Sequence, residues 1–234
     1  MPIRSSRKVQ QGELALDKKR HPNWGGRRPG AGRKPKGPRP MGTLPAVPHH
    51  KREEIERRHP VHVTLRMVKG VWNLRSRRAF RVLQRALLAA HTDSLRLTHF
   101  SIQGNHLHLI LETENRTTLS LGMRSLAIRA AKGLNKMMGR KGRVIADRYH
   151  VRVLRTPRQV RNAINYVLSN YRKHLVEFGE KVGKVTLDEY AAGPAEHVPP
   201  TMKLRPSPLL LEPRTWLLKI GWSRAPAPRP ILEC

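Results

Sequence analysis

The 234-residue sequence is short of cysteine and of long apolar runs, and each shortage excludes a class of protein. Its single cysteine, Cys234, excludes a disulfide framework and a cysteine-ligated zinc site within the chain. No apolar run is long enough to span a membrane, and no basic stretch has the clean apolar side of a membrane-surface helix. The first residues also lack the apolar core of a secretory signal. We therefore expect a reduced, cytoplasmic protein without a membrane partner.

Acidic residues are scarce as well. The chain has 47 Lys and Arg against 16 Asp and Glu, which gives a formal net charge of +31. Like charge at this density opposes compaction unless a polyanion neutralises it, so we expect nucleic acid as the partner and association with the nucleoid. Charge alone favours a simple binding protein over an enzyme, and evidence for chemistry has to come from motifs.

Residues 1–59 are predicted to form a basic flexible arm. In residues 25–40, Arg and Lys alternate with Gly and Pro, and there are too few apolar residues to build a core. Such arms are typical of chains that lie in a DNA minor groove. A solvated linker that touches phosphates without selecting a sequence is an equal alternative. The candidate DNA contacts here are Arg27, Arg28, Arg33 and Lys34.

Residues 60–175 carry the periodic patterns of a folded domain. The patterns predict, in order, a strand at 61–67, a helix at 76–90, strands at 95–103 and 106–112, a helix at 117–138, an extended segment at 144–154 and a last helix opened by Thr156 and Pro157. Gly104-Asn105 provides a tight turn between the two middle strands. The order β-α-β-β-α-β-α is that of an α+β ferredoxin-like domain with one helix added.

Side-chain periodicity predicts which residues are buried. Strict alternation along 95–103 places Leu95, Leu97, His99 and Ser101 on one face, with Arg96, Thr98, Phe100 and Ile102 on the other. The predicted core of the helix at 117–138 consists of Leu119, Met123, Leu126, Ile128, Ala130, Leu134 and Met137. Residues 176–234 are predicted to be a Pro-rich C-terminal extension, in which the apolar runs 209–211 and 216–218 dock on the domain.

Two histidines share one face of the strand at 106–112. Side chains two residues apart on a strand point the same way, so His106 and His108 emerge together while Leu107 points to the opposite face. Two imidazoles on a rigid strand make a partial site for a divalent metal. A third ligand must come from elsewhere in the chain. A chance His-x-His pair is the alternative, because the chain has 12 histidines.

The last helix separates into an apolar and a polar face when residues 157–175 are placed at 100° per residue. Its apolar stripe consists of Val160, Ala163, Ile164, Val167, Leu168, Tyr171 and Leu175. Its polar side carries Asn162, Tyr166, Ser169, Asn170 and Lys173. Tyr166 and Asn170 are one turn apart, so the amide is a candidate third ligand that would hold the phenol near the ion. An exposed tyrosine and asparagine without a role is the alternative.

These residues together resemble a known family. The segment Asn105-His106-Leu107-His108, followed some 55 residues later by Tyr166 and Asn170, resembles the single-tyrosine HUH transposases, and in particular the REP-associated tyrosine transposases. Supporting matches are 62–66 (His-Val-Thr-Leu-Arg) and 147–150 (Asp-Arg-Tyr-His). The resemblance covers roughly residues 60–175, with the arm and the extension outside it.

The resemblance implies a mechanism and a partner. It implies that His106, His108 and Asn170 hold Mg²⁺ or Mn²⁺ and that Tyr166 attacks a phosphate of single-stranded DNA, leaving a 5′-phosphotyrosine and a free 3′-OH. It also implies recognition of hairpin or palindromic DNA next to the cleavage point. Candidates for gripping the stem are Arg75, Arg77, Arg78 and Arg81, for which a solvated charged face is the alternative.

Two other functions fit the same residues. One is a non-catalytic DNA- or RNA-binding protein that keeps the fold. The other is an HUH relaxase or replication initiator, although such proteins usually carry larger domains than this chain provides. The sequence leaves the target DNA, the metal used and the choice between monomer and dimer open.

Overall fold

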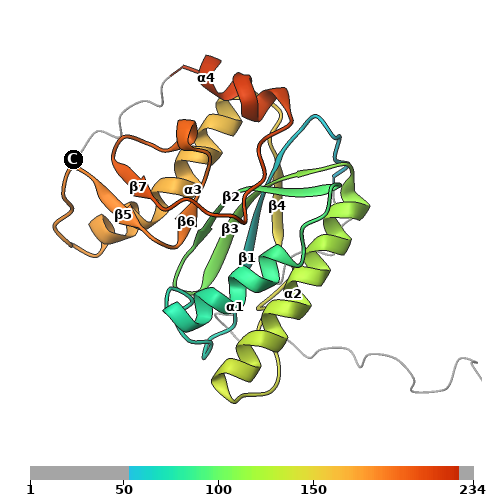
Figure 1. Cartoon of the computed structure of the whole chain (residues 1–234), viewed down its shortest axis with the longest axis vertical. Helices are drawn as coiled ribbons and strands as arrows, with labels where there is room; N and C mark the ends of the chain where they lie inside the picture. Colours follow the sequence, from blue (N-terminus) through green and yellow to red (C-terminus); the bar gives the residue numbers. More distant parts are fainter. Residues whose placement is uncertain (1–52, 227–234) are drawn as a thin grey trace, which may run out of the picture. The chain divides into compact units, whose positions relative to one another are not determined.

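A five-stranded antiparallel sheet forms the centre of the protein in the computed structural model, which describes residues 53–226 (Figure 1). The strands lie in the order β4-β1-β3-β2-β6. Their bounds are β1 Val61–Arg66, β2 Leu95–Ile102, β3 His106–Thr113, β4 His150–Val153 and β6 Ala191–Ala192. The extended segment predicted at 144–154 is thus a strand only over its last third, preceded by an isolated bridge between Ile145 and Met67.

Each long helix begins at the capping residue that its sequence provides. The helices are α1 Arg77–Leu88, α2 Arg116–Met138 and α3 Pro157–Glu177. The side chains of Ser76 and Asn115 accept backbone N–H bonds at the starts of α1 and α2. Thr156 and Gln159 form a capping box at the start of α3. Gly139 ends α2 in the left-handed conformation, with φ of 63°, which glycine adopts without strain.

The helices cover opposite faces of the sheet. Helix α1 connects β1 to β2 and α2 connects β3 to β4, and both lie on one face, whereas α3 lies on the other (Figure 1). Residues at alternate positions of β1 and β3, such as Val63, Leu107 and Leu109, pack toward α1 and α2. Ile110 instead joins the cluster beneath α3. The intervening positions of β1 and β3 therefore line the face that α3 covers.

The alternation predicted for the second strand is wrong in its second half. A β-bulge lies between Leu97 and His99, so the strand gains one residue relative to β3 and its phase reverses. Phe100 and Ile102 consequently join Leu95 and Leu97 in the core beneath α1 and α2. His99 and Ser101 are then left to face α3, not the side predicted for Leu95 and Leu97.

One predicted core position of α2 is also wrong. Ile128 is 45% exposed, whereas Leu126 and Ala130 on either side of it are buried. Ile128 lies 200° round the helix from Leu126, which takes it away from the sheet. The other predicted positions of this helix are buried or packed against the core.

The predicted arm overlaps the described part of the chain only at residues 53–59. Ile55, which falls inside the predicted arm, is 5% exposed and belongs to the core. Glu54 forms an ion pair with Arg116 of α2, so this short segment lies against the domain. The arm residues proposed to contact DNA, Arg27, Arg28, Arg33 and Lys34, lie outside the described residues.

The C-terminal extension packs on α3 and on the edge of the main sheet. Strand β6 pairs with β2, and a second, two-stranded parallel sheet joins β5 Thr186–Asp188 to β7 Met202–Leu204. A 3₁₀ turn at Ala195–His197, a π-helical turn at Leu217–Gly221 and the short α4 Trp222–Arg224 complete it. Leu217 and Leu218 pack in the cluster beneath α3, while Trp216 is 49% exposed. Leu209 joins the cluster on the other face of the sheet.

None of the helices in the described part of the chain combines the length and apolar character that crossing a membrane requires.

Candidate active site

The candidate site lies on the sheet face that α3 covers, where two neighbouring strands bring polar side chains together. Strands β1 and β3 pair antiparallel, with Thr64 opposite His108 and Arg66 opposite His106. Because alternate residues share a face, His62, Thr64 and Arg66 of β1 lie on the same side as the two histidines. The imidazole rings of His106 and His108 are 4.7 Å apart between centroids.

Both histidines of β3 are oriented through the Nδ1 atom. The Nδ1 of His108 is 3.2 Å from the Nε2 of His62 and 3.1 Å from the Oγ1 of Thr64, within hydrogen-bonding distance of each. The Nδ1 of His106 is 2.7 Å from the Oδ1 of Asn105. The Nε2 of His108 is buried and has no hydrogen-bonding partner. Such anchoring through one ring nitrogen is typical of histidines that ligate a metal through the other.

All three site histidines are held in the neutral form. Burial lowers the pKa of His108 to about 3, assisted by the neighbouring His106, His62, His174 and Arg66. Burial likewise lowers the pKa of His106 and of His62 to about 4. An imidazole must be neutral to donate its lone pair to a metal, so the histidines are in the ligand form at neutral pH.

Tyr166 lies over this histidine face. Its ring is 5.0 Å from that of His108 and 5.8 Å from that of His62, edge-on to both. The side chain remains 44% exposed, so a substrate can reach it from solvent. Helix α3 therefore places one phenol beside the pair of candidate ligands and leaves it accessible.

Asn170, the predicted third ligand, is buried, which differs from the exposed asparagine of the alternative interpretation. It is 3% exposed, and its Nδ2 has no hydrogen-bonding partner. His174, one turn further along, is close enough to His106 and His108 to lower the pKa of both. Because Tyr166 on one side of Asn170 and His174 on the other both approach the histidine pair, the amide lies between them, enclosed at the border of the buried apolar stripe of α3.

The donor set fits a divalent ion only with the amide included. Within residues 53–226, no three His, Cys, Asp or Glu side chains group closely enough to hold a metal among themselves. Two neutral imidazoles, of which His108 has a buried and unbonded Nε2, and a buried amide, whose oxygen is the atom able to bind an ion, fit the partial shell of an ion that keeps several waters. Mn²⁺ accepts imidazole more readily than Mg²⁺ does, and Mg²⁺ more readily keeps its waters.

The other three tyrosines of the chain have different surroundings. Tyr171 was predicted to be a core residue, but it is only half-buried, and the guanidinium of Arg75 stacks 3.6 Å from its ring centre. A planar guanidinium stacks favourably on an aromatic face, and this contact keeps the Tyr171 ring at the edge of the core. Tyr149 and Tyr190 pack against the cluster beneath α1 and α2, on the sheet face away from His108.

The four arginines predicted to grip a stem do not share one environment. Arg75 forms an ion pair of 2.8 Å with the fully buried Asp188 of the C-terminal extension, and its side chain is 14% exposed. The charge of Arg75 is therefore neutralised by an ion pair within the protein. Arg77, Arg78 and Arg81 are exposed on α1, which lies on the face of the sheet opposite the histidines.

Three residues of the site were not assigned a role from the sequence. His62 and Thr64 hold His108, and their signal was the alternation of β1, which places both on one face. His174 approaches the histidine pair, and its signal was its spacing of four residues from Asn170. Recognising them required knowing that β1 lies next to β3 and that Tyr166 and His174 of α3 approach the histidine pair.

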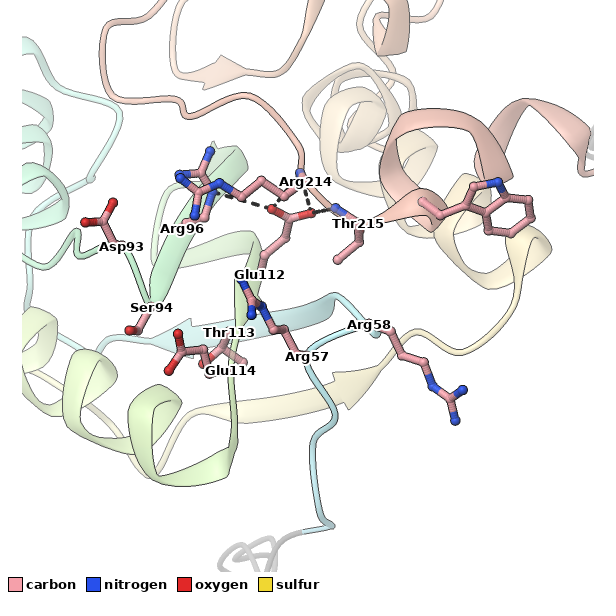
Figure 2. A pocket seen from close by; sticks show the side chains of 11 residues that line it. Arg57, Arg58, Asp93, Ser94, Arg96, Glu112, Thr113, Glu114, Arg214 and Thr215 are labelled. Carbon is pink, nitrogen blue, oxygen red and sulfur yellow. Dashed lines mark hydrogen bonds and ion pairs between the residues drawn. The ribbon is translucent and has the colours of Figure 1, made fainter.

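A separate cavity of about 370 Å³ lies where β2 and β3 meet the C-terminal extension (Figure 2). Glu112 of β3 points toward Arg96, Arg214 and Thr215 in this cavity, and none of the histidines of the site lines it. The carboxylate accepts backbone N–H bonds of 2.9 Å from Arg214 and 2.7 Å from Thr215. This cavity is therefore one of the places where the extension attaches, and it lies apart from the histidine and tyrosine cluster.

Comparison with known proteins gives a partial likeness in fold. No protein-family model matches the sequence, and no curated protein matches it. Among solved structures, one of a REP-associated tyrosine transposase bound to a REP hairpin is similar over 55% of this chain and 74% of that chain. The sequence identity is 16% and the TM-score is 0.45. A likeness with so low an identity and TM-score says nothing about activity, which depends on the residues of the site itself.

Proposed function

We propose that the protein is a metal-dependent, transposase-like endonuclease and strand transferase for single-stranded DNA, of the HUH class. The observation that carries the proposal is Tyr166, which lies edge-on to His108, a histidine fixed through Nδ1 with its Nε2 buried and unbonded. The strand order β4-β1-β3-β2 with helices connecting β1 to β2 and β3 to β4 supports a ferredoxin-like sheet as the scaffold.

His106, His108 and Asn170 would hold the Mg²⁺ or Mn²⁺ ion. When bound, the ion neutralises charge on the non-bridging oxygens of the scissile phosphate, which attack by an anionic nucleophile requires. His62 and Thr64 keep the ring of His108 in a fixed orientation. Arg66, next to His106 in the pairing with β3, adds positive charge on the side where a phosphate would lie.

Tyr166 is the proposed nucleophile. Its phenol oxygen attacks phosphorus and the bond from phosphorus to the 3′ oxygen breaks, which leaves a 5′-phosphotyrosine and a free 3′-OH. The phenol proton leaves to solvent, because the side chain is 44% exposed, and the departing 3′ oxygen takes up a proton from water to become the 3′-OH. The new phosphodiester conserves the energy of the broken one, so a second 3′-OH can attack it and rejoin the strand.

Other basic residues would hold the remainder of the DNA. Arg77, Arg78 and Arg81 of α1 remain candidates for contact with a hairpin stem, and the arm residues Arg27, Arg28, Arg33 and Lys34 for contact with phosphates. Arg75 is left out of this group because Asp188 and Tyr171 occupy its guanidinium.

The proposal is tested by trapping the covalent intermediate. The full-length protein is incubated with single-stranded oligonucleotides that contain a hairpin and a flanking strand, with Mn²⁺ or with excess EDTA. We expect a denaturant-resistant conjugate of protein and DNA in Mn²⁺ and none in EDTA. Binding without any conjugate across a panel of hairpins and flanks would favour the non-catalytic DNA-binding alternative.

A further inference from the structure

Phe178 is the most exposed large apolar side chain in the described part of the chain. Its side chain is 81% exposed at the C-terminal end of α3. A single exposed apolar side chain is ordinary on a protein surface, so the case for a role of Phe178 has to come from the residues around it. The residue has no part in the chemistry proposed above.

Phe178, the C-cap residue of α3, follows Tyr166, Asn170 and His174 at the same spacing of four residues, in a row that winds round the helix by about 40° per step. Tyr166, Asn170, His174 and Phe178 follow one another at intervals of four, so each lies one turn from the next. The rings of His174 and Phe178 are 6.4 Å apart between centroids. The row extends roughly 18 Å along the helix from the phenol, a length that a few unpaired nucleotides can span.

Positive charge accompanies the row at its far end. Lys173, Lys181 and Lys184 are exposed around the end of α3 and in the segment that follows. Glu177 pairs with Lys173 and with His174, which leaves Lys181 and Lys184 outside the ion pairs that this end of α3 forms. An aromatic ring flanked by lysines is the pattern of a surface that stacks a base and holds its phosphate.

We propose that Phe178, with His174 beside it, is a stacking platform for an unpaired base of the DNA strand whose phosphate lies at Tyr166. The proposal rests on the proposed function, since the row is defined by the nucleophile at its other end. Stacking tolerates any base, because every base has an aromatic face, so the platform positions the strand without reading its sequence. It would hold the single strand in register while the hairpin is bound elsewhere.

The test uses oligonucleotides with the fluorescent base 2-aminopurine at successive positions on either side of the cleavage point. Binding is measured in EDTA, so that stacking is read without cleavage. We expect quenching of the probe at one position, a few nucleotides from the cleaved phosphate, and its loss in Phe178→Ala. The affinity for the single strand should fall by roughly 5- to 150-fold, the range for losing one stacked base.

Two variants provide controls. Phe178→Trp should keep the quenching, because it keeps an aromatic face. Val176→Ala removes another exposed apolar side chain, 58% exposed, that lies about 200° round the helix axis from Phe178, and it should leave both quenching and affinity unchanged. Unchanged quenching in Phe178→Ala, or equal losses in Phe178→Ala and Val176→Ala, would overturn the platform.

The proposed function has a separate readout in the same experiment. Conjugate formation in Mn²⁺ tests the chemistry, whereas the fluorescence in EDTA tests the platform. Quenching that depends on Phe178 without any conjugate would refute the nuclease and retain a strand-binding row. A conjugate without quenching at any position would retain the nuclease and refute the platform.

Discussion

Each candidate histidine of β3 is anchored to the protein through one ring nitrogen, Nδ1. Nδ1 of His108 is engaged by His62 and Thr64, and Nδ1 of His106 by Asn105. The fixed rings leave both Nε2 atoms directed away from these partners. At the scale of single residues, the ability of the proposed site to bind a metal therefore depends on how the rings are oriented as well as on which residues are the ligands.

Replacing either candidate ligand should abolish the chemistry with little loss of fold. We expect His106→Ala and His108→Ala each to lower the cleavage rate by more than roughly 100-fold, the upper range for losing a residue that merely supports a ligand. The free energy of unfolding should fall by about 1 kcal/mol. Cleavage is followed with labelled oligonucleotides, and Mn²⁺ affinity by titration calorimetry.

His91→Ala is the matched control for these substitutions. His91 lies in the turn between α1 and β2, away from the histidine face, and should keep both cleavage and Mn²⁺ affinity. Unaltered Mn²⁺ affinity in the His106→Ala, His108→Ala double variant would refute the assignment of these ligands.

At the scale of elements, the local pattern predicted most helices and strands but could not predict how they meet. The cap at Thr156 predicted the start of α3, because a cap is a local interaction, and apolar spacing predicted the start of α1 to within one residue. The bulge in β2 reversed the faces of His99 and Phe100, since a bulge depends on the partner strand. The same limit applies to Asn170, which is buried because of what α3 packs against.

The candidate site shows the same division. Tyr166, His106 and His108 could be proposed from spacing along one helix and one strand, and the structure brings Tyr166 and His108 together. His62 and Thr64 could not, because they belong to the site only through the antiparallel pairing of β1 with β3. From the sequence, Arg75 could not be distinguished from Arg77 and Arg78, because its partner, Asp188, is 113 residues away along the chain.

One carboxylate holds the segment of the C-terminal extension that begins at Arg214. Glu112 is 4% exposed and accepts the backbone N–H groups of Arg214 and Thr215 (Figure 2). Glu112→Ala would leave both donors without a partner, so we expect the protein to lose about 2–4 kcal/mol of stability. Hydrogen exchange should accelerate across residues 214–224.

Glu114→Ala is the matched control, because Glu114 lines the same cavity but is exposed. It should change neither the stability nor the exchange of the extension. Equal protection of residues 214–224 in Glu112→Ala and in the unaltered protein would show that the carboxylate does not hold the extension.

At the scale of the whole molecule, buried histidines should make stability depend on pH. His99 of β2 lies 2.8 Å from His197 of the extension, between Nε2 and Nδ1, and the two rings are stacked. Burial and the partner ring lower the pKa of His99 well below its ordinary value, and burial lowers that of His197. His108 is lowered to about 3 by burial.

A pKa lowered by folding means that the unfolded chain binds the proton first as the pH falls. Stability is therefore complete above about pH 6.5 and declines below it, by about 1.4 kcal/mol per pH unit for each buried histidine such as His99 and His108. Urea unfolding in EDTA at pH 7.5, 6.0 and 5.0 measures this. His99→Gln should flatten the decline, and a stability that is constant over this range would contradict the prediction.

The basic arm should control affinity for DNA but not the chemistry. Removing residues 1–52 keeps Ile55 in the core, and it should weaken binding and reduce the slope of affinity against salt, because fewer counterions are released. Cleavage at saturating DNA should persist. Replacing Arg27, Arg28, Arg33 and Lys34 by alanine in the full chain should reduce the salt slope in the same way, which separates the effect of charge from that of chain length. An unchanged salt slope in both would show that the arm does not contact DNA.

The identity of the residue that carries the DNA tests the central claim most directly. Tyr166 alone among the four tyrosines lies against the histidine face, since Tyr171 is stacked under Arg75 and Tyr149 and Tyr190 pack on the opposite side of the sheet. Peptide mapping of the trapped conjugate should find the nucleotide on Tyr166. Tyr166→Phe should bind DNA without forming a conjugate, while Tyr171→Phe should form it normally. A nucleotide on another tyrosine, or full activity in Tyr166→Phe, would contradict the account.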